Sequence, residues 1–211
     1  METLQEFQTR ALAEVRSPDF HESIARLFDR FRLEDARALA LATNRLRAGP
    51  VAAIEKGAAG AAIVAAAMHH YFGQYEGRGM FDFQYDYWGD RDPDARFPMR
   101  IMDIVFIMPT KRSTRGSVAF QIEAKNYSQV TVSTLTARKI GNQVQKDHLY
   151  LNPRIPGHAP LIPVWWFLQG LDAGARNHLE VQGFRVVDFM SDPFRSQLSR
   201  AFDVPPALRT P

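Results

Sequence analysis

The 211-residue chain contains no cysteine, and this absence excludes several kinds of site. Without a thiol there is no disulfide scaffold, no thiolate-bound zinc or iron–sulfur centre and no cysteine nucleophile. No apolar run reaches the ~18 residues of a membrane-spanning helix, because charged or polar residues interrupt each one, so we expect no membrane partner. Residues 1–16 include acidic side chains and lack the apolar stretch of a signal peptide. The composition, 45% hydrophobic and 23% charged, is typical of a globular protein.

The chain also lacks a strong charge bias, with 26 Lys and Arg against 23 Asp and Glu. So small an excess does not by itself indicate a nucleic-acid partner. The distribution is more informative, because residues 80–109 contain six Asp against three Arg, whereas residues 110–154 contain eight basic residues against two acidic ones. An acidic stretch beside a basic one fits a cation site next to a polyanion-binding surface, or simply two solvated faces of different charge.

Hydrophobic periodicity predicts an α/β protein in three parts: a helical segment over residues 1–50, a core over 51–190, and a helix with a loose tail over 191–211. We expect residues 1–50 to contribute packing rather than chemistry. The core has the predicted order α-β-β-β-α-β-α-β. Its predicted elements are a helix that begins at Val51, strands at 81–88, 99–108 and 117–124, a helix at 133–151, a buried strand at 161–168, a helix at 173–182 and a strand at 184–189. The first three strands should form an antiparallel meander.

Three residues of this meander have the chemistry of a metal-dependent phosphodiesterase. Asp103 is the only ionised residue in the apolar run from Ile101 to Met108, and a carboxylate inside a strand needs a partner such as a metal or a cation. On the next strand, Glu123 and Lys125 point to the same face by strand alternation. We therefore expect the two carboxylates to lie within reach of one Mg²⁺ or Mn²⁺ ion, with the Lys125 ammonium nearby and open to solvent.

These residues, together with the predicted element order, resemble the PD-(D/E)xK nuclease superfamily over roughly residues 51–190. The resemblance implies a restriction-endonuclease-like core, in which a central mixed sheet is flanked by helices. It also implies a Mg²⁺-dependent endonuclease, with Asp103 and Glu123 as metal ligands and Lys125 as catalytic base or electrostatic stabiliser. The superfamily cuts DNA more often than RNA, so DNA is the favoured substrate.

The helix after the triplet extends the resemblance. The stretch from Ile140 to Asp147 is similar to the corresponding helix in the nuclease domains of bacterial polymorphic toxins, and so is the apolar strand at 165–167. Superfamily members often use a glutamine in this helix to orient water or contact a phosphate, which makes Gln143 the first candidate and Gln145 the second. This similarity implies an antibacterial toxin or effector that acts in the cytoplasm of a target cell, reached through a secretion system. It also implies a cognate immunity protein as partner.

The first core helix departs from the family pattern. Members commonly carry a glutamate there, often just after a Gly-x-x-Gly step, but Gly57 and Gly60 are followed by alanines. Glu55 is the nearest acid and our candidate for a third metal ligand, although residues 55 and 61 do not share a helix face. The two glycines do share one, and would let another segment approach closely.

Two alternatives remain open. The chain could be an RNA-cleaving toxin of the same fold, with transfer RNA as substrate. It could also be a nuclease-like module whose site has decayed, as the missing helical glutamate allows, and which binds nucleic acid without cutting it.

Overall fold

The structure, a computed structural model of the chain, describes residues 32–43, 50–72, 80–87, 100–109, 117–150 and 161–203. The helices predicted within residues 1–31 and the tail after residue 203 lie outside these ranges. The described elements are α3 (Leu33–Ala42), α4 (Pro50–Phe72), β1 (Met80–Tyr87), β2 (Arg100–Pro109), β3 (Ser117–Lys125), α5 (Val132–Thr136), α6 (Arg138–Tyr150), β4 (Leu161–Phe167), α7 (Ala173–Val181), β5 (Arg185–Asp188) and α8 (Phe194–Ala201). After residue 50 they follow the predicted order, except that two helices stand between β3 and β4.

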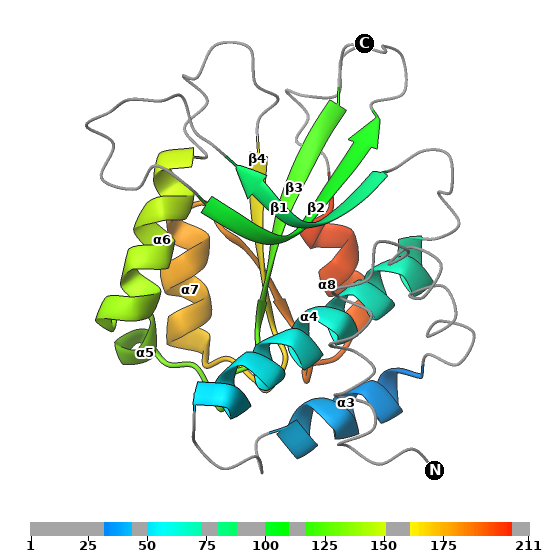
Figure 1. Cartoon of the computed structure of the whole chain (residues 1–211), viewed down its shortest axis with the longest axis vertical. Coiled ribbons are helices and arrows are strands. Elements are labelled where there is room, and N and C mark those ends of the chain that lie inside the picture. The colour runs from blue at the N-terminus through cyan, green and yellow to red at the C-terminus, as the bar shows by residue number, and fades with distance from the viewer. Residues whose placement is uncertain are drawn as a thin grey trace.

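The strands form one mixed sheet in the order β1-β2-β3-β4-β5. Neighbouring strands pair antiparallel from β1 to β3, which confirms the predicted meander, and parallel from β3 to β5. The β4 strand is buried on both faces, as its uniform apolar sequence predicted. The chain is therefore an α/β protein with a mixed sheet flanked by helices (Figure 1).

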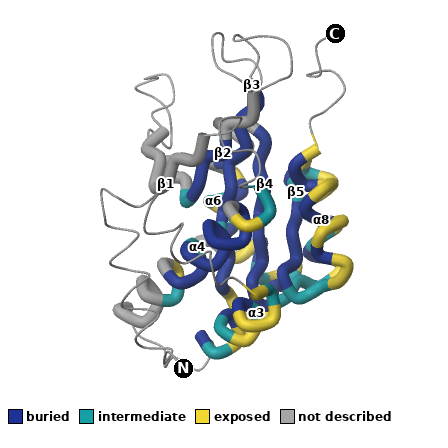
Figure 2. The backbone as a smooth tube through the Cα atoms, turned by 90° about the vertical axis from the view of Figure 1, so that its right-hand side faces the viewer, coloured by how far each residue is buried: buried dark blue, intermediate teal, exposed yellow. Residues whose placement is uncertain are grey.

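Helices cover both faces of the sheet, and each face has its own hydrophobic core. On one face α3, α4 and α8 pack against strand residues that include Phe106, Phe120 and Trp166. On the other face α5, α6 and α7 pack against Trp165 and Phe167. Figure 2 shows buried residues along β3, β4, β5 and α4, with exposed residues on the outer sides of α3 and α8. Because consecutive residues of β4 serve opposite cores, the alternation along each strand decides which side chains meet which helices.

The predicted single helix over 133–151 is wrong, because the chain breaks at Ala137. That residue has φ −59° and ψ 140°, which ends α5 and precedes α6. The α5 sequence is rich in hydroxyl residues, and Thr136 Oγ1 donates to the carbonyls of Val132 and Ser133. Such local side-chain bonds compete with helix continuation.

The segments outside the predicted core limits share the same hydrophobic core. Ala36 and Ala40 of α3 and Leu198 of α8 belong to one cluster with the strands and α4. Arg37 of α3 reaches the segment before α8, where its Nε donates to the carbonyl of Phe189 at 2.6 Å. None of the described helices is long and apolar enough to cross a membrane.

Gly60 lets α4 lie close to the end of β3. A Cβ atom at this position would stand 2.9 Å from Asn126 Cβ and 3.0 Å from Leu168 Cδ1, which is closer than van der Waals contact. A Cβ atom at Gly57 would meet no described residue within 4 Å. Of the two glycines expected to allow a close approach, only Gly60 does so.

Alanine at these two glycines should therefore change stability in opposite directions. Gly57→Ala should raise the free energy of unfolding by about 0.5–1 kcal/mol, since alanine is the better helix former and meets no neighbour there. Gly60→Ala gains the same helix propensity, but its Cβ atom forces neighbouring side chains to move. Such overpacking lowers the free energy of unfolding by about 1–3 kcal/mol. We expect a net loss, measured by urea unfolding. Equal gains in both variants would contradict the close approach.

Candidate functional site

The pairing of β2 with β3 brings Asp103 and Glu123 side by side. Ile104 pairs with Ile122 and Val105 with Gln121, so one further step along the register places Asp103 opposite Glu123. Residues directly opposite in an antiparallel pair share a face, so both carboxylates lie on the face of the sheet that α6 covers. Asp103 Oδ2 accepts the backbone N–H of Ala124 at 2.9 Å, which fixes this carboxylate at the end of the ladder; among the described residues Oδ1 has no hydrogen-bond partner.

Lys125 completes the predicted trio from the same face of β3. Its Nζ donates to Glu123 Oε2 at 2.9 Å and to Gln143 Oε1 at 2.8 Å, and it lies 4.5 Å from the centre of the Trp165 ring. The structure thus brings together Asp103, Glu123, Lys125 and Gln143, while their catalytic and metal-binding roles stay predictions.

Lys125 is not open to solvent, contrary to our expectation. Its exposed fraction is 3%, and that of Glu123 is 1%. The reason is tertiary: Gln143 from α6 and Trp165 from β4 close over the ammonium, and neither can be placed by strand alternation alone.

The electrostatic surroundings hold Lys125 in its charged form. Burial alone would lower the pKa of this ammonium, but attraction to Glu123, Asp103 and Asp147 and the hydrogen bond to Glu123 outweigh it and raise the pKa above the ordinary 10.5. Because the folded state then binds the proton more tightly than the unfolded chain, protonation of Lys125 contributes its full stability below pH 10.5. The contribution is lost only as the pH rises through the higher pKa of the folded state.

Asp147 is a buried carboxylate at the site, and it was not among the candidate site residues predicted from the sequence. Its exposed fraction is 0%, and it accepts from Gln121 Nε2 at 3.1 Å and from Trp165 Nε1 at 2.9 Å. Two features of the sequence could have placed Asp147 at the site. It follows Gln143 by four residues on the same helix, and Gln121 alternates with Glu123 on β3. Together they put two polar helix residues over two polar strand residues.

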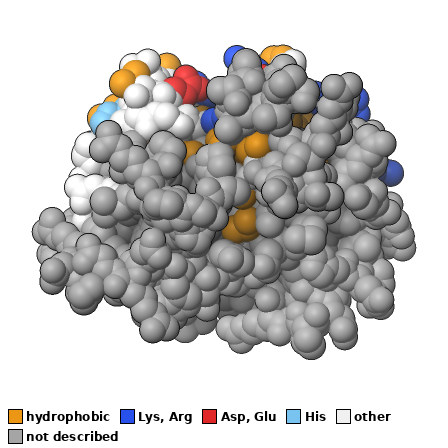
Figure 3. All heavy atoms as spheres, turned by 90° about the horizontal axis from the view of Figure 1, so that it is seen from above, with side chains coloured by type: hydrophobic (Ala, Val, Ile, Leu, Met, Phe, Trp, Pro, Cys, Tyr) orange, Lys and Arg blue, Asp and Glu red, His pale blue; other side chains and the backbone are white. Residues whose placement is uncertain are grey.

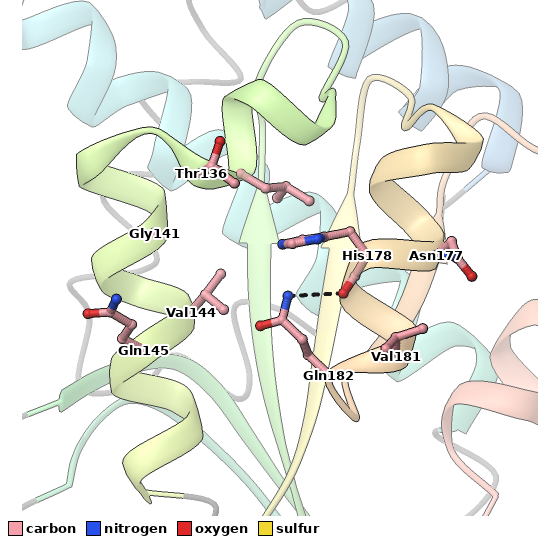
Figure 4. A pocket seen from close by; sticks show the side chains of 9 residues that line it. Thr136, Gly141, Val144, Gln145, Asn177, His178, Val181 and Gln182 are labelled. Atoms are coloured by element: carbon pink, nitrogen blue, oxygen red, sulfur yellow. Dashed lines mark hydrogen bonds between the residues drawn. The ribbon is translucent and has the colours of Figure 1, made fainter.

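Gln145, the second glutamine candidate, lies on the other flank of α6. It is exposed and lines a groove of about 710 Å³ between α6 and α7, which Figure 4 shows with His178 and Gln182 opposite. Gln143, which bonds to Lys125, is therefore the helix glutamine at the site.

The Glu55 side chain lies outside the described residues, so its role as a metal ligand stays a prediction. The α4 helix that carries it packs on the face of the sheet opposite Glu123 and Lys125. The next residue, Lys56, is anchored near the end of β3, because its carbonyl accepts from Asn126 Nδ2 at 2.8 Å.

Asn126 also joins a buried polar network that the sequence did not reveal. Its Oδ1 accepts from Thr43 Oγ1 at 3.2 Å and from Gln169 Nε2. The network ties the end of α3 and the segment after β4 to the residue that follows Lys125, so residues 1–50 contribute more than an apolar face.

Comparison of the chain with protein-family models, with curated proteins and with solved structures finds no match. The site is therefore described from its geometry.

Removing the Lys125 charge should destabilise the fold. Lys125→Met leaves Glu123 buried without its ion-pair partner, and breaking a buried pair in this way costs about 3–5 kcal/mol. We expect that loss in the free energy of unfolding by urea at pH 7, with most of it recovered in the double variant Glu123→Gln/Lys125→Met. Glu180→Ala is the control, since it breaks an exposed pair with Arg176 and should cost less than about 1 kcal/mol. A Lys125→Met loss no larger than that of the control would show that the pair is not buried.

Proposed function

We propose that the chain is a divalent-metal-dependent nuclease built on a restriction-endonuclease-like core of the PD-(D/E)xK type. The observation that carries this proposal is the meeting of Asp103, Glu123 and Lys125 on one face of two adjacent strands, with Gln143 bonded to the lysine. The element order and the mixed sheet support the core assignment.

The donor set suits a hard divalent cation. Asp103, Glu123 and Asp147 all act electrostatically on Lys125, and three carboxylates with one ammonium give these groups a formal charge of −2. A single divalent cation would neutralise it. The described residues contain no cluster of three or more His, Cys, Asp or Glu arranged to hold a metal. Mg²⁺ is commonly bound by one or two carboxylates together with waters and substrate phosphates, so Asp103 and Glu123 meet its requirement.

Each residue has a distinct task in this proposal. Asp103 and Glu123 would hold the cation, and the chemistry that such a cation supplies when bound is polarisation of the phosphate and a lower pKa for the attacking water. Lys125 presents a fixed positive charge, suited to negative charge that develops on the phosphate oxygens. Gln143 holds that ammonium at 2.8 Å.

The site, rather than surface charge, supports a nucleic-acid substrate. Seen from above, described Lys and Arg side chains lie along one edge of the molecule with an acidic patch beside them (Figure 3). Among the described side chains both signs are present, and the net charge of the whole chain is only +3. DNA is our proposed substrate and RNA the alternative, both on the basis of the resemblance. The toxin role and the immunity protein have the same basis and stay predictions.

Digestion of plasmid DNA and of total RNA tests the proposal. The wild-type chain should cleave one of them with Mg²⁺ or Mn²⁺ and lose that activity in EDTA. Asp103→Ala should reduce the rate by at least about 100-fold, since it removes a group positioned to hold charge in the transition state. Asp192→Ala is the control, because that carboxylate pairs with Arg37 at the surface and should leave the rate unchanged. Cleavage that survives both EDTA and Asp103→Ala would rule out the metal-nuclease proposal.

A decayed site is the second candidate function. The observation in its favour is the burial of Lys125 against Glu123, because the two charges neutralise each other without any metal. Such a module would bind nucleic acid in a salt-sensitive way without turnover.

Metal titration separates the two candidates. A live site should bind Mn²⁺, measured by calorimetry, and should lose that binding in Glu123→Ala, because one of its two carboxylate ligands is gone. Glu180→Ala, which removes an exposed carboxylate, should bind Mn²⁺ as the wild type does. Equal and negligible binding by all three proteins would favour the decayed module.

A further inference from the structure

The Lys125 ammonium is enclosed by three groups from three elements. An ammonium has three donors, and two of them are used by Glu123 of the same strand and Gln143 of α6. The ring of Trp165 from β4 lies 4.5 Å from Nζ, at cation–π distance. The orientation of this ring therefore sets one wall of the space that Nζ occupies.

Asp147 fixes the orientation of that ring. Its Oδ2 accepts the indole N–H of Trp165 at 2.9 Å, while Phe184 meets the ring edge-on at a centroid distance of 5.3 Å. Its other oxygen, Oδ1, accepts from Gln121 of β3. The carboxylate thus ties α6 to β3 and β4 directly beneath the lysine.

The neighbouring Trp166 shows that an indole in this sheet does not require a carboxylate. Trp166 is as fully buried as Trp165, but points into the opposite core, and its Nε1 has no hydrogen-bond partner within the described part of the chain. A buried ionised carboxylate is costly unless it is paired. The Trp165 N–H group alone therefore does not explain why a carboxylate stands at position 147, where it also accepts from Gln121.

We propose that Asp147 is a positioning residue, which acts through Trp165 to hold the Lys125 ammonium toward Gln143 and the pair of carboxylates, Asp103 and Glu123. The inference rests on the proposed function, since it assigns Asp147 a part in the same site. Asp147 itself need not touch substrate or cation, because its oxygens are engaged by Gln121 and Trp165.

Two matched pairs of variants isolate this role. Asp147→Asn keeps the size and an acceptor oxygen but removes the charge, and Asp188→Asn makes the same change at another buried carboxylate, on β5. Trp165→Phe and Trp166→Phe remove the same volume from adjacent, fully buried positions, but only Trp165 contacts Asp147 and Lys125.

The first measurement does not depend on activity. The full-length protein is treated with acetic anhydride, and acetylation of Lys125 is followed by mass spectrometry of its tryptic peptides. Lys125 should react slowly in the wild type and several-fold faster in Asp147→Asn and Trp165→Phe. The Asp188→Asn and Trp166→Phe proteins should react as the wild type does. Unchanged reactivity of Lys125 in the first pair, or an equal increase in both pairs, would overturn the proposal.

The second measurement uses the cleavage assay. Asp147→Asn should lower kcat by roughly 10- to 100-fold, since a displacement of about 1 Å in a catalytic group has an effect of that size. The KM for nucleic acid and the affinity for Mn²⁺ should stay within about twofold of the wild-type values. Asp103 and Glu123 are unchanged, and so are the interactions that bind substrate and transition state equally. A matching loss of Mn²⁺ affinity would indicate a structural role instead. If the wild type cleaves neither DNA nor RNA, the nuclease proposal fails, whereas the acetylation result still decides whether Asp147 positions Lys125.

Discussion

The buried ammonium of Lys125 is the constraint on which the arrangement of the site depends. A charge removed from water must be compensated by partners in good geometry, or the fold loses several kcal/mol. Here the partners come from β3 itself, from α6 and from β4. The register of β4 beside β3 and the placement of α6 over both strands are therefore linked to a single positive charge.

The two faces of β3 divide structural and chemical tasks. Phe120 and Ile122 point into the apolar core formed with α4. Gln121, Glu123 and Lys125 point toward α6, and all three are nevertheless buried. Polar groups in such a place contribute less to stability than well-packed apolar groups of the same volume would. Only the face of β3 toward α6 carries these less stabilising polar groups, and a functional site requires such groups.

Much of this could be predicted from the sequence, because it depends on local patterns. Alternation predicted the meander and placed Asp103, Glu123 and Lys125 on one face, and an uninterrupted apolar run predicted the buried β4. The interruption of the helix at Ala137 could not be predicted in this way, because it depends on which hydrogen bonds the hydroxyl side chains of α5 form. The burial of Lys125 and the role of Asp147 were missed for another reason. Both depend on which residues of α6 and β4 meet β3, and sequence periodicity shows a polar flank without showing what it faces.

The charges around Lys125 bear on the cation site that we propose. Lys125 pairs with Glu123, so the more deeply buried of the two proposed metal ligands has a positive partner within the protein. Asp103 is less buried and, within the part of the chain that the structure describes, accepts a hydrogen bond through Oδ2 alone, so it is the group better placed to meet the proposed cation. A cation that engages Glu123 as well must compete with the ammonium, and Lys125 then depends on its remaining contacts, Gln143 and the Trp165 ring. Those two contacts lie on α6 and β4, so they persist whichever positive charge Glu123 faces. In the proposed metal site, the contacts that enclose the Lys125 ammonium would therefore also hold it in place when a cation engages the two carboxylates.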